Sequence, residues 1–187
     1  MKLWLARHAQ PVGGEGLCYG ATDLPADEAQ TLEASTRLAE QLPAGIDVRC
    51  SPLKRCVQMC EPLRLLRPEL RIHPDVRLAE MCFGSWEGRL WSAIEPAAMQ
   101  AWTDDFEHHR PGGGESVHEF MARVAQLFDE ARTGGTDTLW ITHAGVIRAA
   151  NLLASNRRHC ASAAQWPAPA PAFGQWEVLT LDSAATA

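Results

Sequence analysis

Two short, mostly apolar segments near opposite ends of the chain restrict the fold more than any other feature. They are Lys2–Ala6 and Thr138–Thr142, and each has the length and composition of a buried strand. Arg7-His8 follows the first segment and His143 follows the second. Helical patterns fill much of the sequence between them. Strands that alternate with helices predict an α/β fold in which helices cover both faces of the sheet.

The intervening segments extend this alternation. Asp27 precedes an apolar helical pattern that ends before Pro43, and Ile46–Cys50 predicts a second strand. We expect Ser51 to be the N-cap, and Pro52 the first residue, of a helix that continues to about Leu66.

The second half of the chain contains its most regular helical pattern. Ser116 and Glu119 form a capping-box sequence in front of that pattern. A helix over 145–155 and a strand over 176–181 follow, whereas 111–114 is expected to be a flexible break. We expect residues 1–187 to form a single domain in which 182–187 are a frayed tail.

The overall charge excludes several classes of partner. The formal net charge is −6 and the pI is about 5.6, which disfavours binding to nucleic acid or to a membrane surface. A small anionic substrate needs only a local positive pocket.

No apolar run approaches the length of a membrane span, and the first six residues are too short for a secretory leader. A cytoplasmic location is therefore expected. The cysteines are interpreted mainly as half-buried thiols, with metal ligation by Cys56 and Cys60 as the alternative.

The residues that follow the strands suggest an anion pocket. Ligands of open α/β sheets bind beyond the carboxyl ends of the strands, where His8 and His143 are expected to face each other. Arg7 is adjacent to His8, and Arg55 lies in the first turns of the helix after the second strand. Ala144 opens a helix whose N-terminal N–H groups attract anions. Together these groups predict a site for a dianionic oxyanion such as phosphate.

The order and spacing of these residues resemble the histidine phosphatase superfamily, the phosphoglycerate-mutase-like proteins. The matching motifs are Arg7-His8-Ala9, Ser51-Pro52-Leu53-Lys54-Arg55, Glu80 to Gly88 with Phe-Gly-Ser-Trp-Glu-Gly at its end, and Thr142-His143-Ala144-Gly145. The resemblance implies a three-layer α/β/α sandwich around a mostly parallel mixed sheet.

The resemblance also implies a reaction. His8 would attack a phosphomonoester and form a phosphohistidine, while Arg7, Arg55 and His143 neutralise the phosphoryl oxygens. Ala144 would add its backbone to the phosphate site. Glu80 would protonate the leaving oxygen, with Glu87 as the alternative acid. Because these side chains supply the positive charge, no metal or other cofactor is expected.

Within the superfamily the chain resembles the α-ribazole phosphatase branch, through Cys18-Tyr19-Gly20-Ala21-Thr22-Asp23. That resemblance suggests α-ribazole 5′-phosphate as the substrate, with Tyr19 and Trp86 as residues that contact it. Gln10 is a further candidate contact, as a substitute for the Asn that many members of the superfamily direct to phosphate. Trp86, Trp91 and Trp102 are interpreted either as a lid within the segment from Trp86 to Gly114 or as core residues. Ala9 and Ala144 occupy positions where the family has glycine, so a close backbone approach there is in doubt.

Two other functions remain open at this point. A phosphoglycerate-mutase-type phosphotransferase would use the same residues, but it would return the phosphoryl group to a second substrate. A non-catalytic protein that binds a phosphorylated ligand would need only the anion pocket. The oligomeric state, monomer or homodimer, is also open. Among the other histidines, His108 and His109 are expected in a solvated loop, and His73, His118 and His159 belong to no motif.

Overall fold

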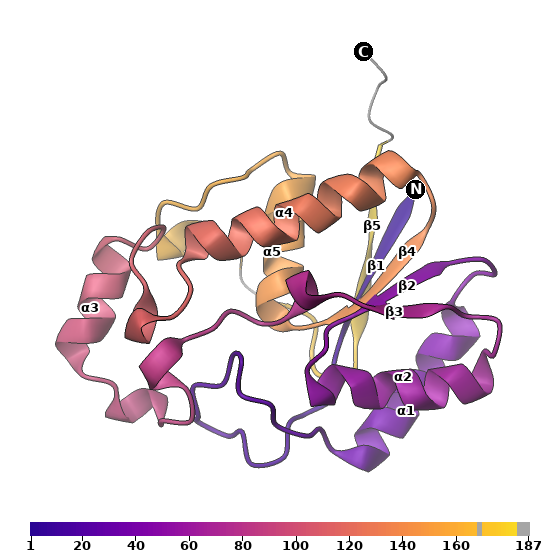
Figure 1. Cartoon of the computed structure of the whole chain (residues 1–187), viewed down its shortest axis with the longest axis horizontal. Coiled ribbons are helices and arrows are strands. Elements are labelled where there is room, and N and C mark those ends of the chain that lie inside the picture. The colour runs from indigo at the N-terminus through magenta and orange to yellow at the C-terminus, as the bar shows by residue number, and fades with distance from the viewer. Residues whose placement is uncertain (168–169, 183–187) are drawn as a thin grey trace.

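The computed structural model describes residues 1–167 and 170–182 of the 187-residue chain. Its centre is a five-stranded sheet in the order β3-β2-β4-β1-β5. The strands are β1 (Lys2–Arg7), β2 (Asp47–Cys50), β3 (Ile72–Pro74), β4 (Thr138–Thr142) and β5 (Trp176–Thr180). Four strands are parallel, and β5 pairs antiparallel with β1 (Figure 1). This is the predicted mixed, mostly parallel sheet.

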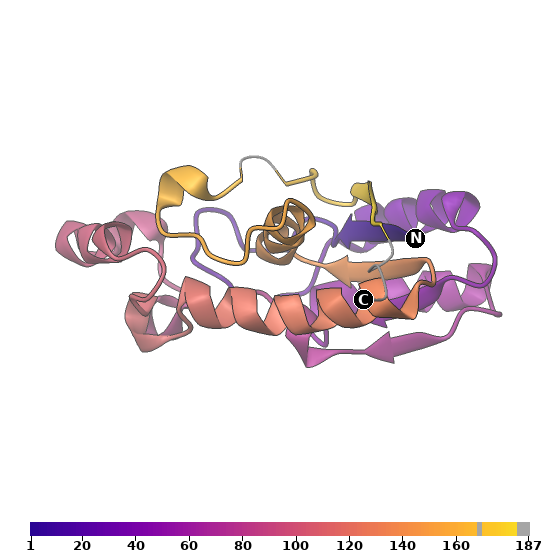
Figure 2. The ribbon, with the colours of Figure 1, turned by 90° about the horizontal axis from the view of Figure 1, so that it is seen from above.

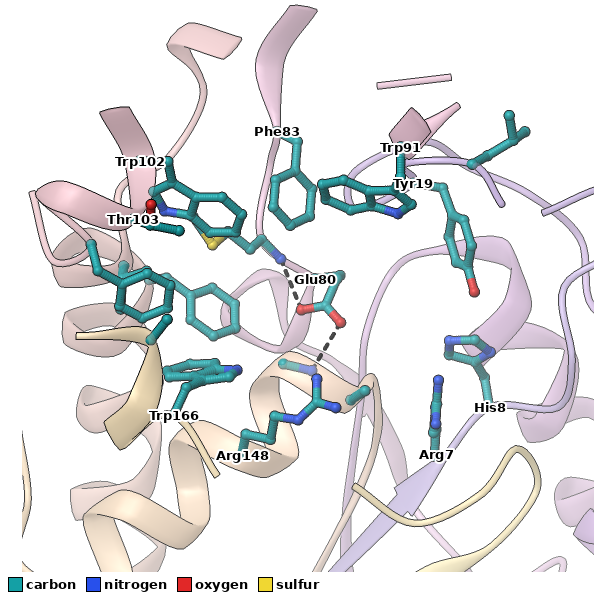
Figure 3. Close-up of a pocket in the computed structure, with 18 of the residues that line it drawn as sticks. Arg7, His8, Tyr19, Glu80, Phe83, Trp91, Trp102, Thr103, Arg148 and Trp166 are labelled. Atoms are coloured by element: carbon teal, nitrogen blue, oxygen red, sulfur yellow. Dashed lines mark hydrogen bonds between the residues drawn. The ribbon is translucent and has the colours of Figure 1, made fainter. Parts of the chain in front are cut away.

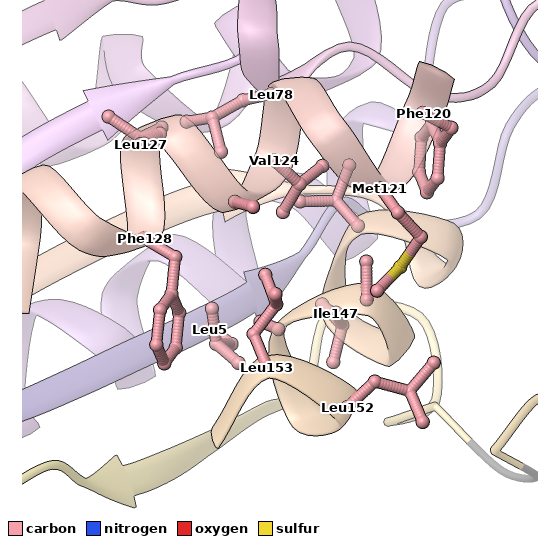
Figure 4. Packing of buried hydrophobic residues seen from close by; sticks show 14 of the residues in the cluster. Leu5, Leu78, Phe120, Met121, Val124, Leu127, Phe128, Ile147, Leu152 and Leu153 are labelled. Atoms are coloured by element: carbon pink, nitrogen blue, oxygen red, sulfur yellow. The ribbon is translucent and has the colours of Figure 1, made fainter. Parts of the chain in front are cut away.

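Five α-helices accompany the strands: α1 (Glu28–Gln41), α2 (Lys54–Leu66), α3 (Pro96–Asp104), α4 (Val117–Gly134) and α5 (Ala144–Ala154). Helices α1 and α2 lie on one side of the sheet, and α4 and α5 lie on the other (Figure 1). Successive side chains of β1 point to opposite faces of the sheet, so the strand packs against both helix layers. Leu3 and Leu5 pack with residues of α4 and α5, as Figure 4 shows for Leu5. Ala6 packs with residues of α1 and α2. The three-layer α/β/α sandwich is therefore confirmed.

Local capping explains where two helices begin. Asp27 caps α1 by accepting a hydrogen bond from the backbone N–H of Gln30 at 2.8 Å. Ser116 and Glu119 form the predicted capping box at the start of α4, and Gly135 ends that helix in the left-handed conformation. Such caps satisfy N–H and C=O groups that the helix leaves without internal partners.

The predicted N-terminus of α2 was wrong. The helix begins at Lys54, and the cap is supplied by Asp23, whose carboxylate accepts the Lys54 backbone N–H at 2.6 Å. Asp23, 31 positions before Lys54, thus caps the helix at the residue where it begins. The Ser51 hydroxyl is fully buried, accepts the backbone N–H of Leu53 at 3.3 Å and lies 2.8 Å from Nε2 of His143.

The segment between β3 and α4 extends away from the sheet. Helix α3 lies at the far end of the molecule from the strands (Figures 1 and 2), and none of its residues is buried. The segment is anchored by a small cluster of Cys18, Trp86 and Ile94. It borders the cavity described below, as a lid would. The expected tail over 182–187 falls outside the described residues apart from Asp182.

The three glycines at 112–114 do not form the flexible break that their composition suggested. Their backbone packs against Gly84, so closely that a Cβ on Gly112 would lie 2.2 Å from the carbonyl oxygen of Phe83. A Cβ on Gly114 would lie 2.2 Å from the carbonyl oxygen of Cys82. The absence of side chains here permits a tight backbone contact, which fixes the base of the extended segment.

Gly112 and Gly113 provide a matched pair for testing this contact, because both have positive φ, 61° and 73°. Nothing lies within 4 Å of a Cβ at Gly113, so Gly113→Ala should cost only the left-handed backbone penalty of about 1–2 kcal/mol. Gly112→Ala should cost about 1–3 kcal/mol more, because the new methyl group overpacks against backbone. Urea unfolding measures both. Equal losses of unfolding free energy would contradict the proposed close packing.

Candidate active site

The parallel pairing of β1 with β4 brings the two predicted histidines together. Arg7 is the register partner of Thr142, so the next residue of each strand emerges at the same edge of the sheet. The ring centroids of His8 and His143 are 5.1 Å apart. Both side chains are buried, with 3% and 0% of their surface exposed. The edge therefore presents two imidazoles that are largely removed from bulk water.

The contacts of His8 define its tautomer. Nδ1 lies 2.7 Å from the carbonyl oxygen of Ala9, and because a carbonyl only accepts, Nδ1 carries the proton and donates it. Nε2 is left with a free lone pair. Burial and the positive charge of Arg55 lower the pKa of His8 to about 3. At neutral pH the ring is consequently uncharged, with one unprotonated nitrogen.

The contacts of His143 define the opposite tautomer. Arg55 donates from Nε to Nδ1 of His143 at 3.2 Å, so Nδ1 is the acceptor. Nε2 therefore carries the proton and donates to the hydroxyl of Ser51 at 2.8 Å. Burial, followed by the nearby rings and guanidinium groups, lowers the pKa of His143 well below its usual value. Ser51, expected as a helix cap, instead orients this imidazole.

Arg55 is completely buried, and all three of its guanidinium nitrogens donate hydrogen bonds. Besides His143, it bonds to the carbonyl oxygens of Thr22 and Gly20, each at 2.7 Å. Leaving such a charge without partners would cost several kcal/mol. The loop over residues 20–22 therefore holds the guanidinium at the edge of the pocket.

Glu87 organises the same loop from its other side. Its carboxylate accepts the backbone N–H groups of Gly20, Ala21 and Thr22 at 2.9–3.1 Å. It also accepts the Phe83 N–H at 2.9 Å and the Thr22 hydroxyl. Burial raises the pKa of Glu87, but these hydrogen bonds outweigh that effect and lower it overall. Glu87 is thus an ionised positioning residue for the loop, which leaves Glu80 as the acid candidate at the pocket.

Glu80 lies at the N-terminus of α5, within the pocket (Figure 3). Its two carboxylate oxygens accept the backbone N–H groups of Met81 at 3.0 Å and Gly145 at 2.9 Å. A Cβ on Gly145 would lie 2.1 Å from the carboxylate, so a side chain there would displace the Glu80 carboxylate from its present position. Ala144 also lines the pocket. The close approach that the glycine motif permits therefore occurs at Gly145, and alanine is accommodated at 144.

Arg7 also lies at the pocket, held in place by the segment before β5. Its Nη1 donates to the carbonyl oxygen of Pro171 at 2.9 Å, and its guanidinium carbon lies 3.9 Å from the ring centroid of Phe173. The Phe173 ring is 5.6 Å from that of His8. Burial lowers the pKa of Arg7, although a guanidinium keeps its charge at any physiological pH. Phe173 carries no motif, and sequence analysis missed it.

A cavity of about 460 Å³ has these polar groups at one end and extends toward α3 and the start of α4. Besides Tyr19, six aromatic rings line it: Phe83, Trp91, Trp102, Phe106, Phe120 and Trp166. Figure 3 shows Trp102 and Trp166 on the side of Glu80 away from His8, with Phe83 and Trp91 between Trp102 and Tyr19. The site therefore has two halves, a polar one that suits phosphate and an aromatic one that suits a bulky apolar group.

The three substrate contacts suggested by the sequence have different positions. Tyr19 lines the cavity, and Arg55 lies over its ring at 5.6 Å. Trp86 is only 5% exposed and packs against Trp102, outside the cavity lining. Gln10 is exposed, and its carbonyl oxygen accepts the Asp27 N–H. The structure thus places Tyr19 at the cavity and the other two away from it.

Arg148 lies in the cavity beside Glu80, and sequence analysis missed it (Figure 3). It follows Ala144 by four residues on α5, so the two share one face of that helix. This spacing was a readable signal, because the helix N-terminus had already been identified as part of the site.

The cysteines lie behind the site or elsewhere in the core. All six are free, and five are buried. Cys56 and Cys60 share the buried face of α2, and Sγ of Cys56 is 3.5 Å from Nε2 of His143. Burial raises the pKa of Cys56, which keeps it a neutral thiol. These contacts favour the interpretation as packed thiols.

The low pKa of His8 predicts the behaviour of its ring. In imidazole-detected NMR, His8 should keep the shifts of the Nδ1-protonated neutral ring between about pH 8 and pH 5, because its folded-state pKa is about 3. Unfolded histidines titrate near pH 6.5. Acidification should therefore lower the unfolding free energy below that pH, since the unfolded chain takes up protons that the folded chain does not. The His8→Gln variant assigns the signal, and a His8 transition near pH 6.5 would refute the assignment.

Two proteins named as phosphatases are similar to this chain in sequence. Adenosylcobalamin/α-ribazole phosphatase of Escherichia coli is 31% identical over 134 residues, which are 68% of this chain and 64% of that protein. A Schizosaccharomyces pombe protein named as a probable phosphatase is 28% identical over 132 residues, which are 70% of this chain. The matches thus span 60% and 64% of these two relatives.

Solved structures show the same fold. A protein of Thermus thermophilus superposes with a TM-score of 0.70 at 28% identity, over 96% of this chain and 93% of that one. A mycobacterial glucosyl-3-phosphoglycerate phosphatase superposes with a TM-score of 0.78 at 24% identity, over 95% and 88% of the two chains. The sequence model of the histidine phosphatase superfamily (branch 1) matches residues 3–165. The chain is a member of this superfamily.

Proposed function

We propose that the protein hydrolyses phosphomonoesters through a phosphohistidine formed on His8. The observation that carries this proposal is the tautomer of His8. Nδ1 donates to the Ala9 carbonyl, and burial lowers the pKa of the ring to about 3. A nucleophilic nitrogen must be unprotonated and pre-oriented, and Nε2 of His8 meets both requirements.

The first step transfers the phosphoryl group to the protein. Nε2 of His8 attacks phosphorus, and the bond from phosphorus to the ester oxygen breaks. Arg7, Arg55 and the N-terminus of α5 at Ala144 stabilise negative charge on the three non-bridging oxygens. His143 lies behind His8, outside the residues that line the cavity, and its Nδ1 accepts a hydrogen bond from Arg55. His143 can therefore stabilise charge on a phosphoryl oxygen only after it takes up a proton or its hydrogen bonds rearrange. Glu80 gives the leaving oxygen its proton.

The second step releases phosphate. Glu80, now ionised, takes a proton from water, whose oxygen attacks phosphorus as the bond to Nε2 breaks. Inorganic phosphate leaves, His8 regains its neutral form and Glu80 is protonated again. Each Glu80 oxygen has two lone pairs, and the N–H groups of Met81 and Gly145 use only one on each. The other lone pairs remain for a proton or for substrate.

The aromatic half of the cavity supports a bulky, flat leaving group. α-Ribazole 5′-phosphate combines a phosphomonoester with an aromatic base, and the E. coli relative carries that activity in its name. We propose an aromatic phosphomonoester of this kind as the substrate. Six rings around about 460 Å³ fit it better than the small, highly charged acid of a phosphoglycerate mutase, because apolar walls do not solvate carboxylates. The retained nucleophile and acid argue against a protein that only binds.

Assays of phosphate release test this function. The wild-type protein should hydrolyse benzyl phosphate with a kcat/KM about 10–100 times that for glycerol 2-phosphate, because both leaving groups are alcohols but only the benzyl group buries a ring in the aromatic cavity. EDTA should not reduce either rate, because side chains of the chain supply the positive charge.

Glu80→Gln should slow hydrolysis of glycerol 2-phosphate by about 10²–10⁴-fold. It should slow 4-nitrophenyl phosphate much less, because nitrophenolate leaves without a proton.

Glu15→Gln is the matched control, since it removes the same charge at an exposed position. Equal losses in Glu80→Gln for both esters would argue against an acid role for Glu80. Equal efficiency on benzyl phosphate and glycerol 2-phosphate would contradict the aromatic substrate. Retention of the phosphoryl group until 2- or 3-phosphoglycerate is added would identify a phosphotransferase instead.

A further inference from the structure

Three residues that belong to no sequence motif converge on the surface outside the active site. They are Glu107, His118 and His159. Oε1 of Glu107 is 2.7 Å from Nδ1 of His159 and 3.7 Å from Nδ1 of His118. One ligand atom from each of the three lies within 4.8 Å of the others. His118 and His159 had appeared unrelated in the sequence, where they lie far apart.

The three side chains come from different parts of the fold. Glu107 follows α3, His118 lies in the first turn of α4, and His159 lies in the loop after α5. The backbone N–H of His118 donates to the carbonyl oxygen of Glu107 at 2.8 Å, which fixes the first two residues relative to each other. The rings of His118 and His159 stack with centroids 6.0 Å apart. The group is thus assembled by tertiary structure rather than by one flexible loop.

We propose that Glu107, His118 and His159 bind a divalent transition metal ion, with Zn²⁺ as the best match. Two imidazoles and one carboxylate are a donor set that Zn²⁺ accepts, with water in the fourth position. Bonds of about 2.0–2.1 Å in a tetrahedral site put ligand atoms about 3.3 Å apart. The observed separations, 2.7 Å and 3.7 Å, lie on either side of that value. Small rotations of the exposed imidazoles would complete the site.

The Glu107 carboxylate is the most enclosed of the three groups, because its side chain is only 13% exposed, whereas those of His118 and His159 are 47% and 72% exposed. The N-terminus of α4 opposes a cation, by a factor of about two to five in affinity. That penalty is small beside the contribution of three direct ligands.

A metal ion at this position would link three segments of the cavity wall. Glu107 follows Phe106, and His118 follows Val117, both of which line the cavity. His159 precedes the short helical turn over residues 163–165, which ends next to Trp166 of the same wall. The site is therefore structural: it would hold the extended segment against α4 and take no part in the transfer of phosphate.

Titration with Zn²⁺ alone tests the proposal on the full-length protein after treatment with EDTA. Isothermal calorimetry should give one equivalent bound with a Kd below about 100 µM, and Zn²⁺ should raise the melting temperature. His159→Ala and Glu107→Ala should each weaken binding at least about tenfold. His73→Ala, which removes an exposed histidine from β3, should leave the affinity unchanged. Co²⁺ in place of Zn²⁺ should give visible absorption bands that His159→Ala removes.

Three results would overturn the proposal. These are no saturable binding by the wild-type protein, unchanged affinity in His159→Ala, and loss of binding in Cys82→Ser. The last would assign the ion to the partly exposed thiol of Cys82. Turnover of metal-free His159→Ala should equal that of metal-free wild type, and a circular dichroism spectrum establishes that the variant is folded.

Discussion

The buried guanidinium of Arg55 links the fold to the site. A charge removed from water requires a partner for each donor, or it costs several kcal/mol. Arg55 obtains those partners from two carbonyl groups of the loop over residues 20–22 and from His143. The loop can present its carbonyls inward because Glu87 binds the N–H groups of the same residues. Asp23, the next residue, caps α2, the helix that carries Arg55. Each contact therefore supports the next.

The chemistry follows from combining this charge with burial. Removal from water and neighbouring positive charge both disfavour a charged imidazole, so His8 and His143 stay neutral where a solvated histidine would be partly protonated. The same positive charge that keeps the nucleophile unprotonated is available to a phosphate dianion. The parallel pairing of β1 with β4 is what brings both histidines within reach of it. Attraction of the substrate and activation of the nucleophile thus have one physical origin.

The sequence predicted what depends on local pattern and strand order. Buried strands that end in histidines, the capping box at Ser116 and the sheet edge shared by His8 and His143 were all correct. It failed where a distant residue competes for a role. Ser51 accepts the Leu53 N–H, but the helix begins at Lys54, where Asp23 is the cap, and the Ser51 hydroxyl also bonds to His143. Gly112 appeared flexible because its contact with the backbone of Phe83 is formed 29 residues away in sequence. Phe173 and the group around Glu107 likewise exist only in the folded chain.

The central claim is that Nε2 of His8 carries the phosphoryl group, and intact-protein mass spectrometry after rapid quenching tests it most directly. Wild-type protein mixed with a phosphomonoester and quenched into alkali, where phosphohistidine survives, should transiently gain the mass of one phosphoryl group. Peptide fragmentation should place that group on His8, and His8→Ala should show no adduct and no turnover. Turnover by His8→Ala, or an adduct on any other residue, would contradict the account.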